Sequence, residues 1–217
     1  DELWAYKSPI VGTKILTADL RWVNVEDLKV GDDLLAFEEE RSGAYRSWKN
    51  STVLATQRKL AKVVRVQHSA GEITVTPEHK FLVEKNGRHD IDWVEAGKLV
   101  AGDLIMKLLP VWREDESNDG GYLAAAFDGE GCLVHPKNGG FELRLSQKHN
   151  EMWRKIGYLL SEFGFRWYDC GRNQDVAQLI VSKKSEVLKF LGSLRPVRLL
   201  PKFDPDKLGR MTAYEWV

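Results

Sequence analysis

The sequence of 217 residues lacks the features that define several classes of protein. Its two cysteines are too few for a disulfide framework, and no Cys/His cluster has the spacing of a zinc site. It has no apolar run long enough to span a membrane, and its first residues do not resemble a signal peptide. From these absences we expect an intracellular, cytoplasmic protein without membrane association.

The chain also lacks net charge, with 32 Lys and Arg against 32 Asp and Glu. This balance hides an asymmetry. Residues 1–116 contain 17 basic and 20 acidic residues, whereas residues 117–217 contain 15 and 12. The basic excess therefore lies in the second half, and it is too modest to identify a nucleic-acid-binding protein by itself. A hydrophobic content of 43% is ample for a core, and the length suits one or two domains.

The first half is rich in Val, Ile, Leu, Thr and Trp, interrupted by Gly and Asp, which predicts short strands. It also contains an internal repeat. Residues 22–32 match residues 93–103 at an offset of 71, with Trp, Val, Leu, Gly and Asp identical. A duplicated unit predicts an all-β domain with pseudo-twofold symmetry.

Two further segments of this half carry a family resemblance. Residues 8–19 are similar to the opening block of an intein, and Thr76-Pro77-Glu78-His79 is similar to a block of the Hint fold that inteins share with hedgehog-type autoprocessing domains. The resemblance implies a horseshoe-like, all-β Hint domain over residues 1–110. It also implies a processing site with Ser8 as nucleophile, His79 as general acid/base and Thr76 holding the peptide bond.

Splicing is not expected of this sequence. The resemblance requires a final His-Asn pair, and residues 212–217 contain none. The pair His149-Asn150 lies in the second half, where we interpret Asn150 as a helix cap. A serine hydroxyl is also a weaker nucleophile than a thiol near neutral pH. Three interpretations of the Hint region stay open: a degenerate domain, an engineered fragment, and a serine substitution that blocks processing.

Residues 111–119 are polar and acidic and predict a linker. They precede the sequence GYLAAAFDGEG, residues 121–131, which predicts a helix with three consecutive alanines that ends at Asp128 and Glu130. The small alanines would let a second helix approach closely. Carboxylates are unfavourable at the negative end of a helix dipole, and a cation or a basic partner would relieve this.

This segment resembles the signature of the LAGLIDADG homing endonucleases. The elements that we predict after it follow the order of that family: strands at about 131–136 and 140–147, an amphipathic helix at 151–163, strands at 165–171 and 176–182, and a helix at 184–192. The resemblance implies an α+β domain over residues 120–217. Its αββαββα arrangement would form a saddle on DNA.

The resemblance also implies a Mg²⁺-dependent hydrolase site at the end of the signature helix. Glu130 would bind Mg²⁺ with help from the carbonyl of Gly129, while Asp128 would support the turn. Gln147 would orient a water molecule, and Lys202 would stabilise charge.

Strand alternation places Glu142, Arg144 and Ser146 on one face, which we predict to be the DNA side. The other candidate DNA contacts are polar or basic side chains on or beside the predicted elements. The full set is Arg144, Ser146, Lys148, Arg166, Arg172, Gln178 and Lys183.

The sequence contains one signature motif, which would supply half of a paired site. The resemblance therefore implies a homodimer that cleaves double-stranded DNA at a long, near-palindromic target. The expected interface residues are Tyr122, Ala124, Ala125 and Phe127. Three alternatives stay open: a nucleic-acid-binding maturase or regulator on the same fold, autoprocessing at Ser8, and a Hint half that serves only as a binding platform.

Overall fold

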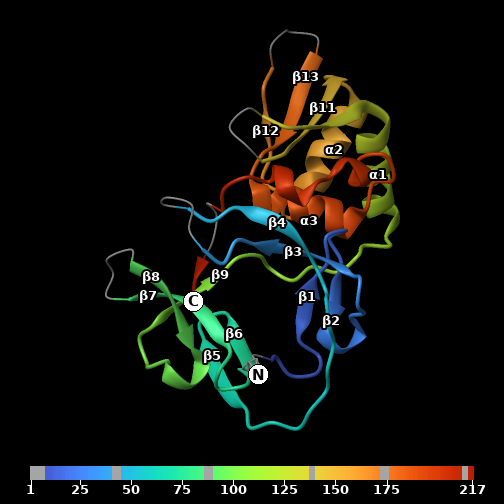
Figure 1. The fold of residues 1–217 in the computed structure, drawn as a ribbon. Helices are drawn as coiled ribbons and strands as arrows, with labels where there is room; N and C mark the ends of the chain where they lie inside the picture. Colours follow the sequence, from blue (N-terminus) through green and yellow to red (C-terminus); the bar gives the residue numbers. More distant parts are fainter. Residues whose placement is uncertain (1–7, 41–44, 86–89, 137–139, 172–175, 212–214) are drawn as a thin grey trace.

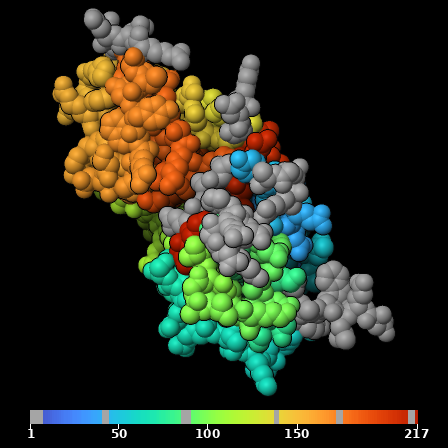
Figure 2. All heavy atoms as spheres, turned by 90° about the vertical axis from the view of Figure 1, so that its left-hand side faces the viewer, coloured from blue at the N-terminus to red at the C-terminus, as the bar shows by residue number. Residues whose placement is uncertain are grey.

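A computed structural model describes residues 8–40, 45–85, 90–136, 140–171, 176–211 and 215–217. The first half of the chain forms a β-rich region and the second half an α+β region, and the two are stacked end to end (Figure 1). Figure 2 shows the same elongated arrangement from the side. Among the described residues, no helix is both long and apolar enough to cross a membrane.

The β-rich region consists of short antiparallel strands and two 3-10 helices. They are β1 (Lys14–Leu16), β2 (Trp22–Asn24), η1 (Val25–Asp27), β3 (Asp33–Phe37), β4 (Trp48–Thr52), β5 (Val64–His68), β6 (Gly71–Val75), β7 (Lys80–Lys85), β8 (Asp90–Glu95), η2 (Ala96–Lys98), β9 (Leu104–Lys107) and β14 (Glu215–Trp216). Strands β1–β6 form three two-stranded sheets, and a fourth sheet has the order β14-β9-β7-β8.

The internal repeat is confirmed as a repeat of structure. The helices η1 and η2 begin 71 residues apart. After each, an aspartate accepts a hydrogen bond from a backbone N–H three residues earlier, at 2.8 Å for Asp32 and 3.0 Å for Asp103. The preceding glycines, Gly31 and Gly102, have φ of +96° and +99°, a conformation that glycine adopts without steric cost. The β-rich region therefore contains two copies of one unit.

The end of the described chain belongs to the β-rich region. Trp216 in β14 pairs with Met106 in β9. In the first copy of the repeat, β4 takes the same place beside β3. The sequence assigned all of residues 120–217 to the second domain, and this pairing corrects that boundary at its C-terminal end. The two residues of β14 form no sequence pattern that predicts pairing with a distant strand.

The α+β region has the element order that the LAGLIDADG resemblance implies. It runs α1 (Asn118–Glu130), β10 (Gly131–Val134), β11 (Glu142–Lys148), α2 (Glu151–Glu162), β12 (Tyr168–Asp169), β13 (Val176–Val181) and α3 (Lys184–Leu194), followed by η3 (Leu200–Lys202) and η4 (Pro205–Lys207). The strands form one antiparallel sheet in the order β10-β11-β13-β12. All three helices contact β11.

Side-chain caps fix where two of these helices begin. The Ser117 hydroxyl accepts a hydrogen bond from the Gly120 N–H at 3.0 Å, and the Asn150 side chain accepts one from the Trp153 N–H at 3.0 Å. Each cap satisfies one of the backbone donors that a helix leaves open at its first turn. The interpretation of Asn150 as a helix cap is therefore confirmed.

The segment predicted as a linker, 111–119, is packed against both regions. The Trp112 side chain is buried, and its indole N–H donates to the Leu20 carbonyl at 3.1 Å. A Cβ at Gly192 of α3 would lie 2.3 Å from the indole nitrogen and 2.6 Å from the Leu20 oxygen, so the contact requires glycine there. One cluster of buried apolar residues has members from both regions, and a smaller one, Val83, Val94 and Ile105, lies within the β-rich region. Most of this segment is polar, so its sequence did not indicate that Trp112 is buried.

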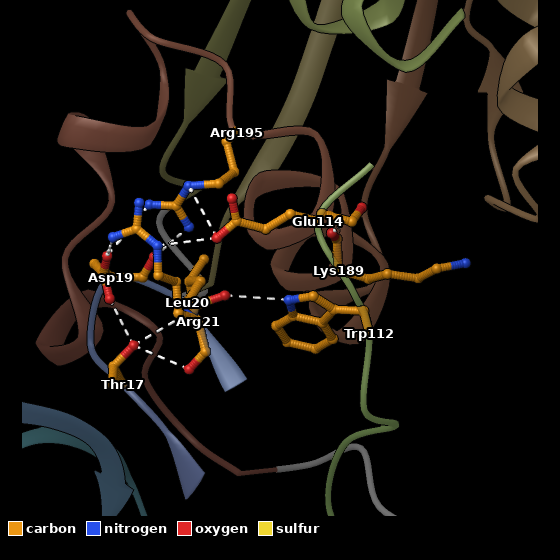
Figure 3. A network of polar contacts seen from close by, with 9 residues as sticks. Thr17, Asp19, Leu20, Arg21, Trp112, Glu114, Lys189 and Arg195 are labelled. Atoms are coloured by element: carbon orange, nitrogen blue, oxygen red, sulfur yellow. Dashed lines mark hydrogen bonds and ion pairs between the residues drawn. The ribbon is translucent and has the colours of Figure 1, made fainter. Parts of the chain in front are cut away.

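Charged side chains surround this junction (Figure 3). Arg195 donates to the carbonyl and carboxylate of Asp19, and Arg21 donates to Glu114 at 2.9 Å. Burial opposes ionisation of Asp19, but the hydrogen bond from Thr17 and the charges of Arg21 and Arg195 outweigh it and lower the pKa of Asp19 below its ordinary value of 3.8. The junction is therefore both apolar and ionic.

Candidate functional site

The carboxylate of Glu130 lies where helix α1 passes directly into strand β10. Glu130 is the last residue of α1 and is exposed, and Gly131 begins β10. A Cβ at Gly131 would lie 2.6 Å from the Phe127 carbonyl oxygen and 3.0 Å from the Phe127 Cα. This abrupt transition therefore requires glycine, whereas a Cβ at Gly129 would meet open space. We call residues 128–131 the motif turn.

Asp128 supports the motif turn from within, as the sequence predicted. Its Oδ1 accepts hydrogen bonds from the backbone N–H groups of Arg198 at 3.0 Å and Leu199 at 3.1 Å. The Arg198 guanidinium in turn donates to the carbonyls of Phe127 at 3.1 Å, Gly131 at 2.6 Å and Asp128. Arg198 is a basic partner of the acidic helix end that sequence reasoning missed.

The structure places Gln147 on the helix-covered side of the sheet. Its Nε2 donates to the Met152 sulfur of α2 at 3.3 Å, and its Oε1 accepts from the Lys148 N–H at 2.8 Å. Leu145, two residues earlier on the same strand face, lies opposite Gly131 of the motif turn. Gln147 is therefore on a strand adjacent to β10, with its side chain engaged by α2.

Lys202 is exposed at the end of η3. Its N–H donates to the Leu199 carbonyl at 3.0 Å, and Leu199 is one of the residues bound to Asp128. The segment that leads to Lys202 is therefore hydrogen-bonded to the motif turn at Leu199. Within the described part of the chain, Glu130, Gln147 and Lys202 make no hydrogen bond to one another.

Glu130 and Gly129 are the candidate metal ligands of the motif turn. A carboxylate at Glu130 and a backbone carbonyl at Gly129 are hard oxygen donors of the kind that Mg²⁺ prefers, and Mg²⁺ usually keeps several waters. The described ranges contain no group of three or more His, Cys, Asp and Glu side chains that could hold a metal ion. The donor chemistry of these two groups therefore fits Mg²⁺.

The open face of the sheet carries polar side chains at alternate positions. Leu143 and Leu145 are fully buried against the helices, whereas Arg144 and Ser146 point the other way. Ser146 accepts a hydrogen bond from Gln178 Nε2 on β13 at 3.2 Å, so these two candidates adjoin. The alternation predicted for β11 is confirmed.

Arg144 is partly neutralised within its own strand. Its guanidinium donates to the Glu142 carboxylate at 2.6 and 2.9 Å. This hydrogen bond, opposed by burial and aided by the charge of Glu142, raises the pKa of Arg144. Among the other candidate DNA contacts, Lys148, Arg166 and Lys183 are exposed. The candidate Arg172 lies outside the described residues.

Helix α1 exposes a face of small residues. Ala125 is exposed, Tyr122 and Ala124 are half-buried, and no atom lies within 4 Å of a Cβ built on Gly121 or Gly129. Glycine and alanine at positions 121, 125 and 129 fall on one helix face because they are four residues apart. The Tyr122 ring is covered by the Lys155 ammonium, 4.1 Å from its centroid.

Phe127 was expected at an interface between subunits, and the structure corrects that position. Its side chain is fully buried, and its ring lies 4.7 Å from the ring of Phe190 in α3. The helix is apolar on several sides, so its sequence did not reveal which residues face its own domain.

The three residues of the expected processing site lie together in the β-rich region. The Ser8 N–H donates to the Thr76 hydroxyl at 3.3 Å, and the Thr76 N–H donates to the Ser8 carbonyl at 3.0 Å. The His79 N–H donates to the Thr76 carbonyl at 3.0 Å. These backbone contacts join segments that are almost 70 residues apart in the chain.

Comparison with known protein families gives a match for the second half of the chain. Residues 117–194 match the family described as LAGLIDADG-like domain. No curated protein matched the chain. The matched residues begin at the Ser117 cap and end at Leu194, the last residue of α3. Residues 117–194 therefore form a LAGLIDADG-like domain, which supports the LAGLIDADG family for this part of the protein.

Proposed function

We propose that this protein is a site-specific homing endonuclease that cleaves double-stranded DNA as a homodimer in the presence of Mg²⁺. A LAGLIDADG-like domain fits a homing endonuclease or a maturase. The observation that favours cleavage is the exposed carboxylate of Glu130 at the end of α1. The negative end of a helix dipole disfavours this carboxylate, and a bound cation would offset that cost.

The proposed roles are those that the LAGLIDADG resemblance implies. Glu130 and the Gly129 carbonyl would hold Mg²⁺, which supplies charge for the phosphodiester oxygens and lowers the pKa of a bound water. Gln147 orients the water after leaving Met152, and Lys202 stabilises developing negative charge.

The open face of the sheet would lie on the duplex. Lys148, Arg166 and Lys183 would contact phosphates, with Arg172 as a further candidate. Ser146, Gln178 and Arg144 would reach base edges, because hydroxyl, amide and guanidinium groups can read the major groove.

A homodimer would supply the second carboxylate that the magnesium site needs. The face of α1 with Gly121, Ala125 and Gly129 lets a second α1 approach closely, and Tyr122 and Ala124 would border the contact. A twofold axis through this contact would bring the two motif turns together and would match a near-palindromic target.

Cleavage of a library of duplex sites in Mg²⁺ tests the proposal, with wild type compared with Glu130→Gln. The variant keeps the size of the side chain but removes its charge, so cleavage should fall at least about a hundredfold while duplex binding persists. Glu162→Gln, on the exposed side of α2, is the matched control and should cleave normally. A wild-type protein that binds duplex DNA or RNA but never cuts would instead indicate a maturase or a regulator.

The contacts of Ser8 favour a second function for the β-rich region, a Hint-like fold that cleaves the chain before Ser8. The hydroxyl of Ser8 would attack the Lys7 carbonyl, the amide bond between Lys7 and Ser8 would break with protonation of the Ser8 amine, and water would hydrolyse the resulting ester. Mass spectrometry of the incubated protein should detect this product, and Ser8→Ala should abolish it. Ser69→Ala, in the exposed β5–β6 turn, is the control; an intact wild-type chain would indicate a degenerate Hint region.

A further inference from the structure

The C-terminal end of α1 carries unfavourable negative charge that no residue of its last turn compensates. Asp128 and Glu130 lie in the last turn, where the open carbonyls give the helix dipole its negative end. No basic residue lies in that turn. The compensating charge comes from Arg198, 70 residues after Asp128 in the sequence.

The Arg198 guanidinium spans the transition from helix to strand. It donates to carbonyls of the last helical turn, at Phe127 and Asp128, and to the carbonyl of Gly131, which is already part of β10. A planar guanidinium offers several donors in fixed directions, so one side chain can hold both elements at a set angle. Gly129 and Glu130, the two candidate metal ligands, lie between these anchored points.

The contact is reciprocal. The Asp128 carboxylate accepts from the backbone N–H groups of Arg198 and Leu199, so the segment that presents Arg198 is itself fixed on the motif turn. Three residues before Arg198, Arg195 is bonded to Asp19 of the β-rich region. The segment from Arg195 to Leu199 is therefore held at both ends, by Asp19 at its start and by Asp128 at its end.

We propose that Arg198 is a positioning residue that fixes the backbone of the motif turn and thereby directs the Glu130 carboxylate toward the metal. The consequence for cleavage rests on the proposed endonuclease function. The structural part, a motif turn held by one guanidinium, stands without it.

The test compares Arg198→Ala and Arg198→Lys with wild type and with Arg154→Ala, an exposed arginine on α2. Three quantities are measured: amide hydrogen exchange at residues 129–132, the Mg²⁺ concentration for half-maximal cleavage, and duplex affinity in EDTA. Arg198→Ala should speed exchange in the motif turn and raise the half-maximal Mg²⁺ concentration by roughly tenfold or more. Duplex affinity should change by less than about threefold, because the guanidinium faces carbonyls of its own chain.

Arg198→Lys keeps the charge but loses the planar set of N–H donors, so it should give intermediate values in both exchange and Mg²⁺ dependence. Normal exchange and normal Mg²⁺ dependence in Arg198→Ala would overturn the inference. So would a loss of duplex affinity with unchanged Mg²⁺ dependence, because Arg198 would then be a DNA contact. If wild type cleaves nothing, the exchange data alone decide the structural part, and the failure belongs to the proposed function. If Arg198→Ala does not fold, the lysine variant decides.

Discussion

Arg195, at the end of α3, donates to the backbone carbonyl of Asp19 at 3.1 Å and to its carboxylate at 3.2 Å, although 176 residues separate the two (Figure 3). Arg195 and Leu20, the neighbour of Asp19, are the two non-glycine residues with positive φ in the described part of the chain. Such conformations cost energy and persist where the surrounding contacts hold them. The junction between the two regions is therefore a specific contact.

Removing the carboxylate of Asp19 should weaken this junction. The Asp19 side chain is 48% exposed, so solvent screening should limit the cost of Asp19→Ala to about 1 kcal/mol of unfolding free energy. Urea denaturation checks this value. Glu116→Ala, which removes an exposed carboxylate from the segment that joins the two regions, should change the free energy by less than about 0.5 kcal/mol.

The contribution of Asp19 should also depend on pH. Its pKa is lowered in the folded protein, so its stabilising effect is fully present above the unfolded value of about 3.8 and is lost as the pH falls through the folded pKa. The stability difference between wild type and Asp19→Asn should therefore be constant near neutral pH and should shrink below about pH 4. A series of urea denaturations from neutral to acid pH measures it. A difference that grows on acidification would contradict the assignment.

Gly192→Ala should disrupt the apolar part of the same junction. The new methyl group would overlap the Trp112 indole and the Leu20 carbonyl, and both belong to the packed interior. We expect a loss of about 1–3 kcal/mol, visible in the thermal midpoint and in Trp fluorescence. The same change at Gly121 meets open space within a helix, so it should stabilise an isolated chain by about 0.5–1 kcal/mol. Equal effects at the two sites would rule out the steric explanation.

Ala125→Glu tests the proposed homodimer. Ala125 is exposed, so the chain should fold normally, but two buried carboxylates would face each other across a twofold contact. Sedimentation should show only monomer, and cleavage of the paired target should be lost. Tyr158→Glu, which places the same charge on the exposed side of α2, should change neither property. A monomeric Ala125→Glu protein with full cleavage activity would disprove the dimeric site.

Local patterns predicted much of this fold. The Gly-Asp pairs 71 residues apart correspond to two turns of the same geometry, Asn150 caps α2, and alternation along β11 separates Leu145 from Ser146. These features depend on short-range conformational preferences, which the sequence carries directly.

Features that depend on long-range contacts were missed. Nothing near Arg198 indicates that its guanidinium binds carbonyls of a helix 70 residues earlier. Phe127 was assigned to an outer face because α1 has apolar residues on most of its circumference, and only packing against Phe190 decides the orientation. The burial of Trp112 likewise depends on α3, which the chain forms 72 residues later.

The pairing of β14 with β9 has a consequence for how the chain is built. Lys107 and Glu215 lie directly opposite each other in the antiparallel pair of β9 and β14. The chain therefore leaves this sheet and returns to it at the same register position. The α+β region lies between these two residues, which are as close as the ends of a hairpin. A short turn joining these two residues would preserve the pairing of β9 with β14.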